Sequence, residues 1–133
     1  MFIQSLLNQG NMPLLEQTLH FSAARAKLIA ENVSNATTPG YVQKDFSVEK
    51  FQKMLRDRVD GRSQMPAGAM RFDDINVEIE HPTANILFHD RNNRSMEQLM
   101  SDTNKNFLYH NMMIELLRKQ IGSMEMALKE RVA

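Results

Sequence analysis

Histidine and carboxylate side chains are the groups in this sequence best suited to acid–base or metal chemistry, and their spacing gives them no site. The four histidines (His20, His81, His89 and His110) show neither H-x-x-x-H nor H-E-x-x-H spacing, which would place two imidazoles on one helix face around a metal. His89 and Asp90 are adjacent, but no nucleophile accompanies them by motif. Five scattered glycines form no phosphate loop, and the absence of cysteine excludes thiolate chemistry. We therefore expect no enzyme activity, no cofactor and no metal.

The most informative polar residues lie between 30 and 41, where a helical pattern stops. Pro39 and Gly40 predict a type II turn over residues 38–41, because Pro presets φ at the second position and Gly supplies a positive φ at the third. The amides of Asn32 and Asn35 are suited to cap carbonyls at the end of the preceding helix. By itself, this segment is an ordinary helix stop.

A long C-terminal helix is predicted over residues 96–131, where apolar residues alternate spacings of four and three. Ser95 and Gln98 form a capping box at its start. This repeat, the C-terminal seam, comprises Met96, Met100, Thr103, Phe107, His110, Ile114, Leu117, Ile121, Met124 and Leu128. One helix cannot bury such a seam, so a partner helix is expected.

A second helix is predicted over residues 12–36, with Pro13 in its first turn and an end before Pro39. Its repeat, the N-terminal seam, comprises Leu15, Leu19, Ser22, Ala26, Ile29, Val33 and Ala36. Small residues in the middle of this seam allow close approach of another helix. The expected assembly contacts are the larger apolar members of both seams, Leu15, Leu19, Ile29, Val33, Met100, Phe107, Ile114, Leu117, Ile121, Met124 and Leu128.

The middle region, residues 37–95, is expected to be irregular. Residues 45–59 predict a short helix, residues 60–68 a loop, and residues 75–79 a weak strand that would belong to a small β-hairpin. Residues 86–88 are another short apolar piece. The fold class is therefore mainly α, with the two long helices paired as a coiled-coil-like hairpin in one domain over residues 1–133.

The charge and hydrophobicity of the sequence limit the classes of partner that we expect for the chain. Lys and Arg number 16, as do Asp and Glu, so no basic field favours nucleic acid, and the balance permits self-association. No apolar run approaches the roughly 20 residues that a membrane helix needs, and residues 1–7 lack the basic start of a cleavable secretory signal. The 11 methionines suit either adaptable helix interfaces or ordinary core filling.

Two polar features have competing interpretations. His110 in the C-terminal seam is either a pH-sensitive switch or, as we favour, a polar residue that sets helix register by hydrogen bonding. The sequences beginning at Asn32, Asn35 and Asn93 match the N-glycosylation sequon, which is short and frequent. In a chain without a predicted secretory signal we interpret these matches as chance.

The order of residue types over residues 32–41 is more specific for a protein family than the turn that these residues predict. It resembles the N-terminal signature N-[LVI]-[SA]-N-x-x-T-P-G-[YF] of the bacterial flagellar axial proteins, the rod and hook family. The matching residues are Asn32, Val33, Ser34, Asn35, Thr38, Pro39, Gly40 and Tyr41. Residues 90–98, Asn104, residues 109–111 and residues 116–119 resemble the C-terminal block of the proximal rod protein of the flagellar basal body.

The resemblance implies a structural subunit of the proximal rod, exported unfolded through the flagellar type III apparatus and polymerised helically in the periplasm to transmit torque. It implies as partners other copies of the chain, the other proximal rod proteins, the base-adaptor protein and export-gate components, without direct membrane insertion. Another proximal rod protein of the same family is the first alternative. A soluble coiled-coil adaptor or export chaperone is the alternative from a different class.

Overall fold

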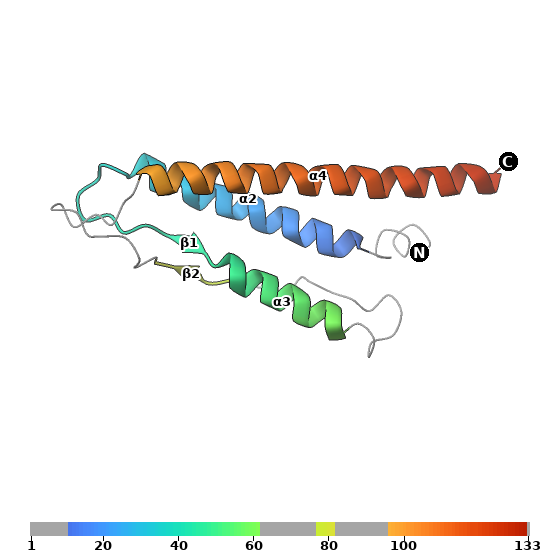
Figure 1. Cartoon of the computed structure of the whole chain (residues 1–133), viewed down its shortest axis with the longest axis horizontal. Coiled ribbons are helices and arrows are strands. Elements are labelled where there is room, and N and C mark those ends of the chain that lie inside the picture. The colour runs from blue at the N-terminus through green and yellow to red at the C-terminus, as the bar shows by residue number, and fades with distance from the viewer. Residues whose placement is uncertain (1–10, 62–76, 82–95, 133) are drawn as a thin grey trace.

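A computed structural model describes residues 11–61, 77–81 and 96–132, and Figure 1 shows how its elements are arranged. In chain order these are α2 (Met12–Ser34), β1 (Asp45–Phe46), α3 (Val48–Asp60), β2 (Ile79–Glu80) and α4 (Met96–Val132). The expected capping residue Ser95, the apolar piece at 86–88, residues 62–68 of the expected loop and residues 75–76 of the expected strand lie outside the described residues. Within the described part of that expected strand, only Ile79 lies in a strand. Within them, the prediction of a mainly helical chain with a long C-terminal helix is confirmed.

The two long helices lie side by side and run in opposite directions (Figure 1). At about 1.5 Å per residue, the 37 residues of α4 extend for about 55 Å and the 23 residues of α2 for about 35 Å. The far end of α4 therefore continues beyond the start of α2. α2 ends at Ser34, two residues before the predicted boundary, because Asn35 takes φ −101° and ψ 13° and leaves the helix.

The short helix α3 packs against the side of α2 that faces away from α4 in Figure 1. Phe51, which is 1% exposed, stacks on Phe21 with ring centroids 3.9 Å apart, and Leu55 completes this small core. The predicted helix start at residue 45 was wrong. Ser47 is the N-cap and its hydroxyl accepts a hydrogen bond from the Lys50 N–H, so the helix begins at Val48.

Residues 45 and 46 instead form a strand. β1 pairs antiparallel with β2, with Asp45 opposite Glu80 and Phe46 opposite Ile79. The two strands are separated in sequence by α3, so this pair is not the small β-hairpin that was expected. An ion pair between Lys50 and Glu80 ties β2 to the first turn of α3.

Candidate assembly surface

Asn32 is the centre of the segment that leads out of α2. Its side chain is 3% exposed, and its Oδ1 accepts hydrogen bonds from the Lys44 N–H at 2.9 Å and the Tyr41 hydroxyl at 3.0 Å. Its Nδ2 donates to the Lys44 carbonyl at 2.6 Å. The prediction that this amide caps the end of the preceding helix was wrong, because the amide bonds to Tyr41 and Lys44, which follow the turn. Since the amide is buried and bonded, the sequon at Asn32 is not presented for glycosylation.

The turn itself lies between these two bonded segments. The Tyr41 N–H donates to the Thr38 carbonyl at 3.3 Å, and Gly40 has φ 75°, the positive value that the third position of a type II turn requires. Pro39 is exposed at the tip. Asn35 does cap the helix, because its Nδ2 donates to the Glu31 carbonyl at 2.9 Å. The turn therefore folds the chain back so that residues 41–44 lie beside α2.

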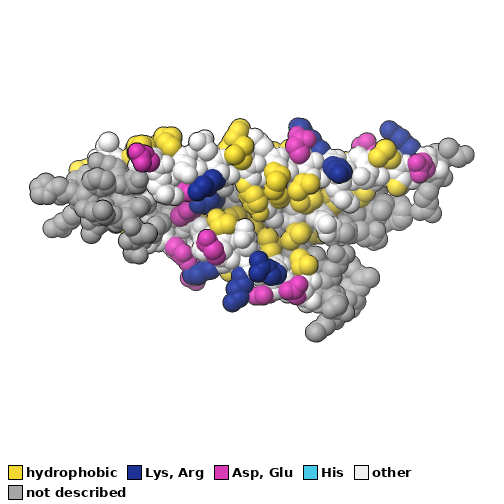
Figure 2. Space-filling view, viewed as in Figure 1, with side chains coloured by type: hydrophobic (Ala, Val, Ile, Leu, Met, Phe, Trp, Pro, Cys, Tyr) yellow, Lys and Arg dark blue, Asp and Glu magenta, His cyan; other side chains and the backbone are white. Residues whose placement is uncertain are grey.

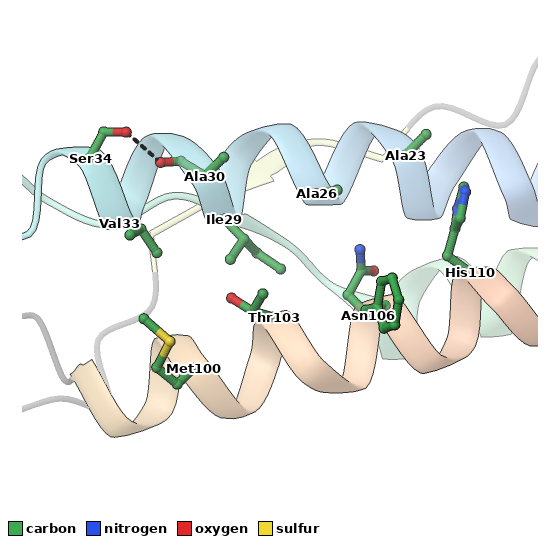
Figure 3. Close-up of a pocket in the computed structure, with 11 residues that line it drawn as sticks. Ala23, Ala26, Ile29, Ala30, Val33, Ser34, Met100, Thr103, Asn106 and His110 are labelled. Carbon is green, nitrogen blue, oxygen red and sulfur yellow. Dashed lines mark hydrogen bonds between the residues drawn. The ribbon is translucent and has the colours of Figure 1, made fainter.

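The remaining residues of the motif have smaller roles. The exposed Ser34 donates its hydroxyl hydrogen to the Ala30 carbonyl at 2.9 Å, within α2. The Thr38 hydroxyl donates to Asn35 Oδ1 at 3.3 Å. Val33 is half-buried and points toward α4 (Figure 3). All eight motif residues thus belong to one connected helix end and turn.

Two ion pairs hold Lys44 and Asp45, which follow the turn, against α2. Arg25 donates from Nε and Nη2 to the two carboxylate oxygens of Asp45 at 2.8 and 2.7 Å, with both side chains largely shielded from solvent. This hydrogen bonding raises the pKa of Arg25 above its ordinary value. Lys44 pairs with Glu31 at 2.7 Å. Burial raises the pKa of Tyr41, and the Glu31 carboxylate adds to the rise.

The contact between α2 and α4 centres on Ser22, which is fully buried. Its hydroxyl donates to the Leu19 carbonyl at 2.8 Å and is hydrogen-bonded to His110 Nδ1 at 2.7 Å, while Asn106 Nδ2 donates to the Ser22 carbonyl at 2.9 Å. His110 therefore makes a hydrogen bond across the two helices. Sequence reasoning missed Asn106, which is 6% exposed, because an apolar repeat does not include an asparagine.

Apolar residues beside this polar centre differ from the predicted seam. Leu99 and Met113, at 2% and 7% exposed, are the buried apolar residues of α4 among those described. The C-terminal seam is divided: Ile114, Leu117 and Met124 are half-buried, and Met100, Phe107, Ile121 and Leu128 are exposed. In the N-terminal seam, Ile29 is buried, and Leu15, Leu19 and Val33 are half-buried. The proposed role of these residues in contacts between subunits stays a prediction.

A groove runs between α2 and α4 on one side of their contact (Figure 3), with a volume of about 660 Å³. Its lining is mostly apolar and contains no Asp, Glu, Lys or Arg. The lining residues are Ala23, Ala26, Ile29, Ala30, Val33 and Ser34 of α2, and Met100, Thr103, Asn106, Phe107 and His110 of α4. Seven of them are members of the two predicted seams, so the groove lies along part of both seams.

Apolar side chains also reach the surface away from the groove. Leu108, Met112 and Leu116 of α4 are 67%, 51% and 42% exposed. Figure 2 shows hydrophobic side chains gathered over the middle of the face that Figure 1 presents, with charged side chains spread around them. Contiguous exposed apolar patches mark surfaces that bind other proteins, so these side chains are candidate contacts for a partner.

Neither a metal centre nor a membrane span is found within residues 11–61, 77–81 and 96–132. No three His, Asp or Glu side chains gather there in a way that could hold an ion, and none of the helices described is apolar enough over sufficient length to cross a bilayer. No protein-family model and no curated protein matches this chain.

Proposed function

We propose that this chain is a structural subunit of the proximal rod of the bacterial flagellar basal body, which joins other subunits in a helical assembly that transmits torque. The observation that carries the proposal is the buried Asn32 within the motif at 32–41. Its three hydrogen bonds join the helix end to the chain after the turn. The motif is therefore one physical unit, and its resemblance to the axial-protein signature covers that whole unit.

The long helices support an assembly role. In this proposal, α2 and α4 pair as a coiled-coil-like hairpin, with the hydrogen bond between Ser22 and His110 helping to set their register. The pair leaves several large apolar side chains of α4 in solvent, among them Phe107 at 62% and Leu108 at 67% exposed. Burying this surface against neighbouring subunits would stabilise the rod.

The partners in this proposal are other copies of the chain, the other proximal rod proteins, the base-adaptor protein and components of the export gate. The chain would reach the periplasm through the flagellar type III apparatus and remain in the rod without inserting into a membrane. Catalysis has no part in this function. Rigid packing of helices is the property that torque transmission requires.

The test uses a flagellated bacterium whose genome encodes this chain. The gene for the chain is deleted, and a plasmid then supplies either the wild-type gene or the Asn32→Ala variant. We expect loss of swimming on deletion, full rescue by the wild type and weaker rescue by Asn32→Ala. Basal bodies purified from the rescued strain should contain the chain. Ser34→Ala is the matched control, because it removes one hydrogen bond of an exposed hydroxyl in the same motif.

The competing function is a soluble coiled-coil adaptor or export chaperone. Such a protein would also be needed for swimming, so motility alone does not separate the two. Fractionation does, because an adaptor or chaperone would be recovered in the soluble fraction and be absent from washed basal bodies. That distribution would overturn the rod assignment, as would normal swimming of the deletion strain.

A further inference from the structure

The groove between α2 and α4 has the shape and chemistry of a site for one more helix. Ala23, Ala26 and Ala30 on the α2 side are small and exposed, so another backbone can approach closely. Met100 and Phe107 form the α4 side and remain 46% and 62% exposed. Because no charged side chain lines the groove, a charged occupant would have nothing to pair with. The groove therefore favours an apolar row of side chains on a helix.

Such a row exists on α4 itself. Leu108, Met112 and Leu116 follow one another at intervals of four residues, which places them along one side of the helix, and all three are exposed. We call these three residues the α4 ridge. At about 1.5 Å per residue the ridge is roughly 12 Å long, and the part of α2 from Ala23 to Val33 is roughly 15 Å long. The ridge therefore fits within the length of the groove.

The ridge and the groove lie on different sides of the molecule. At 3.6 residues per turn, the ridge is rotated by roughly 150° around α4 from the side of the helix that carries Met100, Thr103 and Phe107. A copy therefore cannot place its own ridge in its own groove, since both belong to the same straight helix. Each copy instead has one groove and one ridge free to bind separate neighbours.

We propose that the α4 ridge of one copy packs into the groove of the next copy. The contact joins two different surfaces, so it is head-to-tail and can continue along a chain of subunits without closing into a two-fold dimer. The formal net charge of zero leaves little long-range repulsion between copies. This inference deepens the proposed function and rests on it for its biological setting, because it names the surfaces through which identical subunits would associate.

Engineered cysteines provide a direct test, because the natural chain has none to interfere. Ala26→Cys places a thiol in the groove and Met112→Cys places one in the ridge. When the two purified variants are mixed under mild oxidation, the mixed disulfide should exceed either homodisulfide by about tenfold, because a disulfide requires Cα atoms within about 7 Å. Equal yields of all three species, or a dominant Ala26→Cys homodisulfide, would overturn the head-to-tail contact.

A charge placed in either surface gives a second, independent test. Ala26→Glu should disable the groove and Met112→Glu the ridge, and each should weaken self-association of the purified chain about a hundredfold or more, since an unpaired charge would be buried. A mixture of the two variants retains one intact groove and one intact ridge, so it should form dimers and nothing longer. Sedimentation velocity over a concentration series measures both effects.

The matched control is Gln52→Glu, which adds the same charge to an exposed position of α3 outside both surfaces. It should associate like the wild type, and circular dichroism should show equal helix content in all variants. Wild-type association by Ala26→Glu and Met112→Glu would overturn the inference even if the chain is present in basal bodies. Absence of the chain from basal bodies would overturn the proposed function, while the mixed disulfide would still report the contact.

Discussion

Between Asn32 and Asp45 the side chains bond to one another and to the backbone, whereas from Leu108 to Leu128 many apolar side chains of α4 face solvent. The first region contains a buried amide with three bonds and a two-bond Arg–Asp pair. The second leaves Leu108, Met112 and Met126 more than half exposed. In the first region the described contacts are made within the chain, whereas the second has apolar surface that a neighbouring subunit would cover. The comparison separates what holds the subunit together from what would hold an assembly together.

The largest expected effect contrasts two leucines of α4. Leu99→Ala should lower the free energy of unfolding by about 2–5 kcal/mol, because it truncates a leucine that is 2% exposed. Leu108→Ala should change it by no more than about 0.5 kcal/mol, since that side chain is 67% exposed. Urea unfolding of dilute protein measures both. Similar losses for the two variants would contradict the division of α4 into a packed side and a free side.

The next effect tests the bonded region. Asn32→Ala should cost about 1–3 kcal/mol, because it leaves the Lys44 N–H, the Lys44 carbonyl and the Tyr41 hydroxyl without their partner. Ser34→Ala should cost about 0.5 kcal/mol or less, because its hydroxyl is exposed. Thermal unfolding followed by circular dichroism compares them. Equal melting temperatures for the two variants would contradict the central role of Asn32.

A smaller effect is expected at Gly40. The space around it is open, with no atom within 4 Å of an added Cβ, so substitution acts only through the backbone at φ 75°. Gly40→Ala should cost about 1–2 kcal/mol, the usual penalty for a left-handed conformation. Gly40→Asn should cost less, because asparagine tolerates this region better. The type II turn is contradicted if alanine is tolerated as well as asparagine in urea unfolding.

The smallest effect is on pH dependence. Burial raises the pKa of Tyr109, and a hydrogen bond with Thr18 partly offsets the rise. The folded state therefore keeps the phenol proton at pH values where the unfolded chain, with a pKa of about 10, has lost it. The resulting stability is present below pH 10 and is lost as pH rises through the raised pKa. Tyr109→Phe should make the alkaline fall in stability shallower, and an unchanged slope would contradict this assignment.

The sequence pattern predicted the existence of the helices better than the sides that they bury. The C-terminal seam assumes 3.5 residues per turn, whereas a straight α-helix has 3.6, so a strict heptad drifts around the helix by about 20° every seven residues. Over four heptads this drift moves Met100 and Phe107 out toward the groove while Leu117 and Met124 remain half-buried.

Other differences arise because polar contacts have no periodic signal. Asn106 is buried through its hydrogen bond to the Ser22 carbonyl, 84 residues away in sequence, which no local pattern indicates. The Arg25–Asp45 ion pair could not be predicted either, because the two residues lie 20 positions apart in sequence and belong to no repeat. The start of α3, by contrast, could have been found, because Ser47 followed by Glu49 is a capping signal that the broader helix prediction at 45–59 overran.

The amide of Asn32 pairs with both the N–H and the carbonyl of Lys44, as a neighbouring strand would. It recognises main-chain atoms, which every residue except proline presents in the same way. The type of residue at 44 can therefore change without altering this pairing. Proline is the exception at this position, because it lacks the N–H from which Asn32 Oδ1 accepts its hydrogen bond.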